Sequence, residues 1–195
     1  MTSLLERMNR KDMREKAMEN RRSKKIPFTI LVDTSGTMQH NDNIGKVNRG
    51  LRSFYDVMRE DSKLCDALDI SIVTFGKDGV QLAVDFDDIR NQHLPTFEAA
   101  HNTPLCEALT LAIDNIEDQI DVYQSLGIGS TQPIMLIMTD GEPSQLDYSP
   151  EGDPIKLQKT DLEFIEVKKK FDYFAKLTHM ETHIIAMGHE FDDLL

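Results

Sequence analysis

Tryptophan is absent from these 195 residues, and cysteine occurs only twice. Cys65 and Cys106 are too few to hold a metal cluster by themselves, and they need not be bridged. We expect both thiols to be reduced, in or near the core, which favours a cytoplasmic protein. No apolar stretch approaches the roughly 20 residues that span a bilayer, and the charged amino terminus lacks the pattern of a secretory signal. We therefore expect a protein without a membrane-spanning segment.

Basic side chains are scarce beyond the amino terminus. Residues 1–25 carry nine Lys or Arg and four acidic residues, a net charge of +5, whereas residues 26–195 carry −17. This acidic body is expected to repel nucleic acid and anionic membranes, so we expect neither as a partner. The first 25 residues have a helix-forming composition with a thin apolar stripe, and we predict a basic helical arm. For this arm we favour a solvated or self-docked helix over a contact with nucleic acid or a membrane.

The apolar pattern of the remaining chain, 26–195, alternates between strand and helix periods within one domain. Strands are predicted over 28–32, 69–75, 80–86, 133–139 and 182–188. Helices are predicted over 44–58, 105–120 and 160–177, the last with Leu162, Ile165, Phe171 and Phe174 facing inward. A polar turn is expected over 39–43, and loops over 126–132 and 142–159.

Strands that alternate with helices predict an α/β fold, doubly wound with right-handed crossovers and helices on both faces of a mostly parallel sheet. The segment Gly76-Lys77-Asp78-Gly79 predicts a hairpin, because two glycines flank a polar pair between apolar runs. The strand after this hairpin would be the one antiparallel strand, at an edge of the sheet.

The most informative stretch is Ile30-Leu31-Val32-Asp33-Thr34-Ser35-Gly36-Thr37-Met38, an apolar run that ends in small oxygen-bearing side chains. Such a run predicts a buried strand, and the loop after it lies at the carboxyl edge, where open α/β sheets bind ligands. Asp33, Ser35 and Thr37 are spaced by two, so their oxygens can converge. Carboxylate and hydroxyl oxygens are hard ligands that suit Mg²⁺, Mn²⁺ or Ca²⁺ better than zinc.

Two other motifs point to the same edge of the sheet. Thr103 precedes the predicted helix at 105, and Asp140 follows the most apolar predicted strand. Taken singly, Asp, Ser and Thr in such places are common turn and cap residues. Their occurrence at the ends of separate predicted elements favours one shared oxygen cluster.

The set resembles the metal-ion-dependent adhesion site (MIDAS) of von Willebrand factor A (vWA) domains, whose pattern is Asp-x-Ser-x-Ser, a Thr from a second loop and an Asp after the fourth strand. Asp33, Ser35, Thr103 and Asp140 match residue by residue, and Thr37 stands where the family usually has Ser. The resemblance covers about residues 26–190. It is closest to the bacterial tellurite-resistance-associated (TerY-like) subgroup, through Asp33 to Met38, Thr-Pro-Leu at 103–105 and Thr-Asp-Gly-Glu-Pro at 139–143.

The resemblance implies a Rossmann-like vWA fold and a non-catalytic module whose divalent cation binds an Asp or Glu of a partner protein. Mg²⁺ is the first choice of cofactor, with Mn²⁺ or Ca²⁺ as alternatives. Related bacterial proteins are encoded with Ser/Thr kinases and phosphatases or in stress and phage-defence clusters, which implies partners of that kind. The chain departs from the family because only residues 189–195 follow the last predicted strand, where members have a further helix.

Two alternatives to this interpretation remain. Haloacid-dehalogenase-type phosphatases also carry an acidic loop after an apolar strand, with a nucleophilic Asp at the position of Asp33. Their second acidic residue is the general acid or base, and Ser35 cannot supply that carboxylic proton near neutral pH. The other alternative is a structural vWA domain whose oxygen cluster holds no metal.

Overall fold

The computed structural model describes residues 24–141, 144–148 and 154–187. Its strands are β1 (Lys24–Thr34), β2 (Leu68–Gly76), β3 (Gly79–Asp88), β4 (Gly129–Ser130), β5 (Ile134–Thr139), β6 (Ser144–Tyr148), β7 (Pro154–Lys156) and β8 (Glu181–Ala186). Its helices are a 3-10 helix (Gly36–Asp42), α2 (Asn43–Glu60), α3 (Ser62–Ala67), α4 (Leu105–Leu126) and α5 (Leu162–Thr178). The predicted arm lies outside these ranges, apart from the two lysines that begin β1.

The main sheet has the strand order β3-β2-β1-β5-β8, with the two-residue β4 also paired to β1. β1 is parallel to β2 on one side and to β5 on the other, β5 is parallel to β8, and β3 alone is antiparallel, at an edge. The central strand is buried along most of its length because helices cover both faces. The predicted doubly wound α/β fold, with one antiparallel edge strand, is confirmed.

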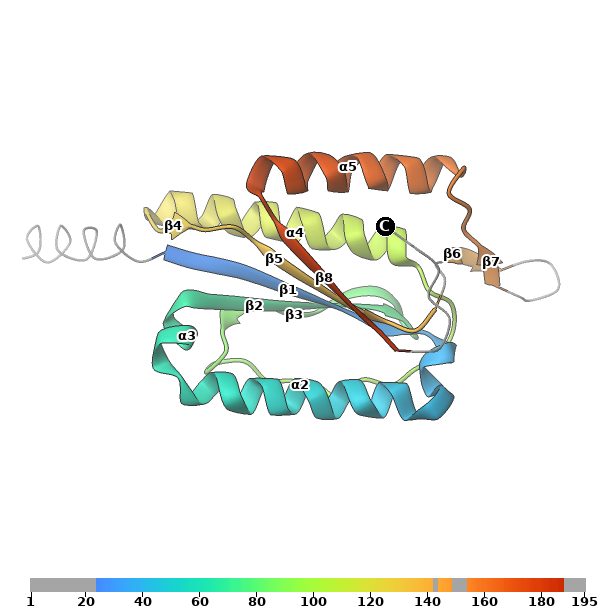
Figure 1. The fold of residues 1–195 in the computed structure, drawn as a ribbon, viewed down its shortest axis with the longest axis horizontal. Helices are drawn as coiled ribbons and strands as arrows, with labels where there is room; N and C mark the ends of the chain where they lie inside the picture. Colours follow the sequence, from blue (N-terminus) through green and yellow to red (C-terminus); the bar gives the residue numbers. More distant parts are fainter. Residues whose placement is uncertain (1–23, 142–143, 149–153, 188–195) are drawn as a thin grey trace, which may run out of the picture.

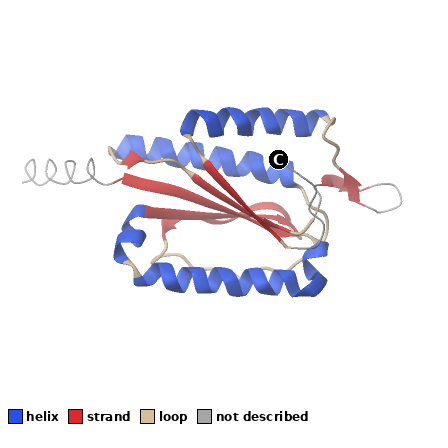
Figure 2. Cartoon of the chain, viewed as in Figure 1, coloured by secondary structure: helices blue, strands red, loops and turns tan. Residues whose placement is uncertain are grey.

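The helices form two layers on either side of the sheet (Figures 1 and 2). α2 and α3 lie on one face, and α4 and α5 on the other. Successive β1 residues alternate between the two cores, since Ile30 and Val32 pack on the α2 side while Leu31 packs on the α4 side. Along α2, a buried residue recurs every four positions, at Asn43, Val47, Leu51 and Tyr55. The helix therefore presents one narrow stripe to the sheet.

A buried polar cluster fixes the amino end of β1. The Lys25 ammonium lies 2.8 Å from Oδ1 of Asp69 on β2, and the hydroxyl of Tyr123 on α4 donates to Oδ2 of the same carboxylate over 2.7 Å. Burial, together with this contact, raises the pKa of the Tyr123 phenol above its ordinary value. Three elements are thus joined at the point where the chain enters the sheet.

The structure corrects several local predictions. The segment 142–159, predicted as a loop, contains the antiparallel pair β6–β7, and the loop 126–132 contains β4, paired to β1 at Lys24 and Lys25. The polar turn at 39–43 belongs mostly to the 3-10 helix, and α3 was not predicted because its six residues are too few to show a period. Leu162 was predicted to face inward but is 76% exposed, because it is the first residue of α5, whereas Phe174 is buried.

Both cysteines are free and buried, as predicted. None of the helices in the described ranges is at once long enough and apolar enough to cross a lipid bilayer.

Gly76 makes the closest backbone approach in the hairpin between β2 and β3, and this yields a prediction. Its φ is +142°, and a Cβ there would lie 2.3 Å from the carbonyl carbon of Thr34 and 2.4 Å from the amide nitrogen of Ser35. Gly76→Ala should lower the free energy of unfolding by more than about 2 kcal/mol in urea denaturation, because backbone atoms cannot give way.

Gly50 supplies the matched control for this substitution. It lies within α2, and a Cβ there would meet no atom within 4 Å. Gly50→Ala should stabilise the protein by roughly 0.5–1 kcal/mol through helix propensity. Equal effects of the two substitutions would contradict the close approach at Gly76.

Candidate metal centre

Two strands deliver the acidic residues of the site to one edge of the sheet. β1 pairs in parallel with β5 up to Val32 opposite Met138, so Asp33 and the residues after Thr139 leave the sheet side by side. The loop after β1 is fixed by main-chain bonds, since the Thr34 carbonyl accepts from the amides of Lys77 (3.1 Å) and Ala100 (2.8 Å). The Gly36 amide donates to the His101 carbonyl over 2.8 Å. This loop is therefore held in place by backbone groups of two neighbouring segments.

Asp33 is the innermost member of the site, with no exposed surface. Its Oδ1 accepts from the Ser35 amide over 2.8 Å, and its Oδ2 accepts from the hydroxyl of Thr139. Burial raises the pKa of Asp33 to about 6, against the hydrogen bonds from Ser35 and Thr139, and the nearby Asp140 contributes to the increase. The ionised carboxylate is thus costly in this position without a compensating positive charge.

A chain of hydroxyls connects the first acidic residue to the second. The Ser35 and Thr37 hydroxyls lie 3.0 Å apart, and the Thr37 hydroxyl donates to Oδ1 of Asp140 over 2.7 Å. Ser35 is buried, Asp140 is half-buried and Thr37 is exposed. The cluster therefore extends from the core, at Asp33, to the surface, at Thr37.

Thr103 joins this cluster through the loop before α4. Its amide donates to the Ser144 hydroxyl over 2.7 Å, and its carbonyl accepts from the Ser144 amide over 2.8 Å. A Cβ placed on Gly141 would lie 3.3 Å from the Thr37 hydroxyl oxygen and 3.8 Å from that of Thr103. Both hydroxyls therefore border the small space above Gly141, and the structure brings all five predicted residues to one place.

Asn43 is a member of the site that the sequence analysis missed. Its Nδ2 donates to Oδ2 of Asp140 over 2.8 Å and to the Met187 carbonyl over 3.2 Å, and its Oδ1 accepts from Lys46 over 3.0 Å. Asn43 is only 5% exposed. One signal was present in the sequence, because Asn43 lies four residues before Val47 on the apolar stripe of α2, where a polar residue needs a partner. Thr139 and Ser144 gave no such signal.

The residues present suit a hard divalent cation. The five predicted residues offer two carboxylates and three hydroxyls, and none of these five side chains carries a nitrogen or sulfur atom. Within the described part of the chain, the ion pairs include neither Asp33 nor Asp140. A cation at this edge would supply the positive charge that the buried Asp33 lacks. Asp33, Ser35, Thr37, Thr103 and Asp140 are the side chains that could hold it.

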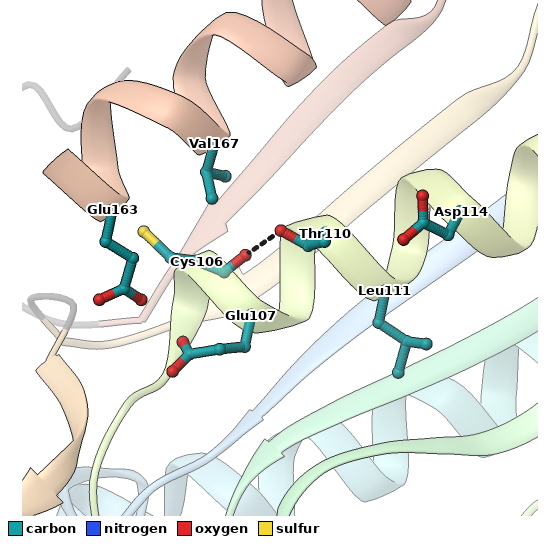
Figure 3. Close-up of a pocket in the computed structure, with 7 residues that line it drawn as sticks. All are labelled: Cys106, Glu107, Thr110, Leu111, Asp114, Glu163 and Val167. Atoms are coloured by element: carbon teal, nitrogen blue, oxygen red, sulfur yellow. Dashed lines mark hydrogen bonds between the residues drawn. The ribbon is translucent and has the colours of Figure 1, made fainter.

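A surface hollow of about 320 Å³ lies between α4 and α5, and none of these five residues lines it (Figure 3). Cys106, Glu107 and Glu163 border it, together with Val167. Burial raises the pKa of the Cys106 thiol to about 12, with Glu163 and Glu107 adding to the effect. The thiol is therefore protonated near neutral pH and is a poor nucleophile.

The raised pKa of Asp33 predicts a pH dependence of stability in metal-free buffer. The unfolded carboxyl releases its proton near pH 3.8, whereas the folded one retains it up to about pH 6. The free energy of unfolding should therefore fall by up to about 3 kcal/mol as pH rises between these values, and it should stay level above them.

The Asp33→Asn variant is the control, because its side chain at position 33 does not titrate. The Thr139 hydroxyl can reorient to accept a hydrogen bond from the amide group of that side chain. The unfolding free energy of the wild type relative to this variant should thus decrease from about pH 4 to about pH 6. A difference that stays constant with pH would contradict the prediction.

No family model matches the chain, and no curated protein matches it. Among solved structures, the pilus adhesin SpaC from Lactobacillus rhamnosus GG in its open conformation is similar over 70% of this chain, with 18% identity and a TM-score of 0.50. The match covers 18% of the adhesin, so the chain corresponds to a small part of that protein. The VWA domain of SpRpn10 is similar over 85% of this chain and 89% of its own length, at 11% identity and a TM-score of 0.49. The match to the adhesin shows a shared fold, and nothing about metal or partner.

Proposed function

We propose that this chain is a vWA-type protein-binding module that depends on a divalent cation, Mg²⁺ first, bound at a MIDAS. The observation that carries the proposal is the convergence of Asp33, Ser35, Thr37, Thr103 and Asp140 from three separate segments of the chain. A cation held there supplies an electrophilic centre that an Asp or Glu side chain of a partner protein can bind.

The five residues would contribute to such a site in two different ways. Asp33 and Asp140 provide the negative charge, while Ser35, Thr37 and Thr103 provide neutral oxygens, so a divalent cation would keep much of its positive charge. Thr37 and Asp140 lie at the surface end of the cluster, and Gly141 leaves space beside them. An incoming carboxylate would therefore approach from that end. Asn43 orients Asp140 without contributing a ligand atom.

The net charge of the chain indicates the class of partner, and the family resemblance suggests a narrower set within that class. The acidic body makes nucleic acid and anionic membranes poor partners, so we propose a protein ligand. The TerY-like motifs favour a bacterial stress-response or defence complex in the cytoplasm, with a kinase, a phosphatase or a defence protein as partner.

Two observations weigh against a phosphatase that uses Asp33 as nucleophile. Asp33 has no exposed surface, and both of its carboxylate oxygens accept hydrogen bonds from neighbours. Ser35 occupies the position of the general acid and cannot act as one near neutral pH. We therefore propose a non-catalytic module.

Magnesium should stabilise the wild-type protein and leave Asp33→Ala unchanged. At a Mg²⁺ concentration of about 100 times Kd, the stabilisation is about 2.7 kcal/mol, or roughly 5–10 °C in melting temperature for a chain of this size. Each protein is compared with itself in chelator and in Mg²⁺, so that effects of the substitution on folding cancel. Asp172→Ala, which removes an exposed carboxylate on α5, is the control and should respond like the wild type. A wild-type melting temperature insensitive to Mg²⁺, Mn²⁺ and Ca²⁺ would contradict metal binding and leave a structural domain.

Asn43→Ala tests the role of the orienting side chain. The loss of its bond to Asp140 should weaken Mg²⁺ binding by at least about tenfold in calorimetric titration, as removal of such outer partners does at other metal sites. Asn48→Ala is the matched control, because Asn48 lies on the same helix but bonds to the backbone of Phe97. It should lower stability and leave the Mg²⁺ affinity unchanged. Equal affinities in the two variants would show that Asn43 has only a structural role.

A further inference from the structure

One face of the sheet is less covered toward the β8 edge than elsewhere. On the α4 side of β5, Met135 and Ile137 are buried. On the α2 side of the same strand, Ile134 and Leu136 are only half-buried, and Ile185 of β8 is 44% exposed. Register places Ile134 beside Phe28, and on β8 it places Glu181 beside Ile134, His183 beside Leu136 and Ile185 beside Met138. The apolar side chains of this face therefore border two exposed polar residues of β8. We call Phe28, Ile134, Leu136 and Ile185 the open face.

The open face continues onto α2. The rings of Phe28 and Phe54 meet edge to face with centroids 5.8 Å apart, and both residues are half-buried. Among the described elements, β8 has substantial contacts only with β5, and α2 runs along the same face of the sheet as the open face (Figure 1). The described part of the chain therefore leaves apolar surface exposed between α2 and β8, which is costly in water.

We propose that residues 1–23 dock on the open face as an amphipathic helix, which makes the basic arm an integral cover of the domain. The proposal concerns a different surface from the metal centre and does not depend on a bound cation.

The point where the arm leaves the sheet is close to the open face. β1 begins at Lys24, four residues before Phe28, and the Lys25–Asp69 pair fixes this end of the strand. β5 and β8 are the next two strands on that side, each about 5 Å further. A helix of 23 residues is about 34 Å long, whereas the six residues of β8 span about 20 Å. The arm is thus long enough to cross the whole open face.

The composition of the arm complements the surface it would cover. At 100° per residue, Leu4, Leu5, Met8 and Met18 lie on one face of such a helix, whereas Met13 and Ala17 lie outside this face. Residues 1–23 carry seven Lys or Arg and four acidic residues, a net charge of +3, against −15 for residues 24–195. Attraction between these charges favours docking on the body over release into solvent.

The carboxyl-terminal residues are a weaker candidate for the same role. Residues 188–195 contain three acidic side chains and no Lys or Arg, so their charge opposes docking on an acidic body. As a helix, eight residues would measure only about 12 Å.

The absence of tryptophan allows a direct test in the full chain. Ile185→Trp places a single tryptophan on the open face, at a position exposed enough to accept it. If the arm docks, the fluorescence emission of this tryptophan should be blue-shifted and resistant to quenching by acrylamide. Adding Leu4→Gln, Leu5→Gln, Met8→Gln and Met18→Gln, which preserves charge and helix propensity, should shift the emission to the red and increase quenching several-fold. Adding Asn9→Gln and Asn20→Gln instead should change neither.

A second reporter controls for general effects of the arm. Leu126→Trp lies at the end of α4, is 57% exposed in the wild type, and should be quenched equally in all arm backgrounds. Equal quenching of Ile185→Trp with the native and the glutamine-substituted arm would overturn the proposal. Protection that disappears on dilution would also overturn it, because a second copy of the chain would then be the cover.

Discussion

The parallel pairing of β1 with β5 is the constraint on which the rest of the site depends. Each strand is an apolar run that ends in an acidic residue, and only adjacent, parallel strands release two such ends at the same edge. The core supplies the energy for this arrangement, because the residues before Asp33 and Asp140 are buried on one or both faces. Burial of the apolar runs thus forces two carboxylates together, against their mutual repulsion.

Burial, with a smaller contribution from the nearby Asp140, raises the pKa of Asp33. A fully buried carboxylate close to another acidic residue is a poor choice for stability alone. The surrounding hydroxyls reduce this cost, yet they bring no positive charge. Such an arrangement is typical of sites that sacrifice some stability for a ligand. It is the physical reason to prefer a cation-binding function over a purely structural one.

The sequence predicted the features that depend on local pattern. The alternation of apolar runs and helical stripes was enough for the fold class, and the Gly76–Gly79 pair was enough for the hairpin. Asp33, Ser35, Thr37 and Asp140 could be assigned to one edge because the ends of parallel strands meet there. Thr103, which precedes a helix, was assigned to the same edge through the resemblance to the vWA metal site. Asn43 was missed because its partners, Asp140 and the Met187 carbonyl, are 97 and 144 residues away along the chain. The β6–β7 pair was missed because short, polar strands between prolines carry no period that distinguishes them from a loop.

The loop after β1 is anchored by the main-chain atoms of its neighbours, since the Thr34 carbonyl and the Gly36 amide bond to the backbones of Lys77, Ala100 and His101. Every residue has a peptide group, so these backbone hydrogen bonds do not determine which side chains stand in the two segments that hold the loop. Substitutions in these two segments can change the surface around the oxygen cluster while the loop keeps its backbone position. Descendants of one ancestral domain could in this way acquire different binding preferences without rebuilding their central chemistry.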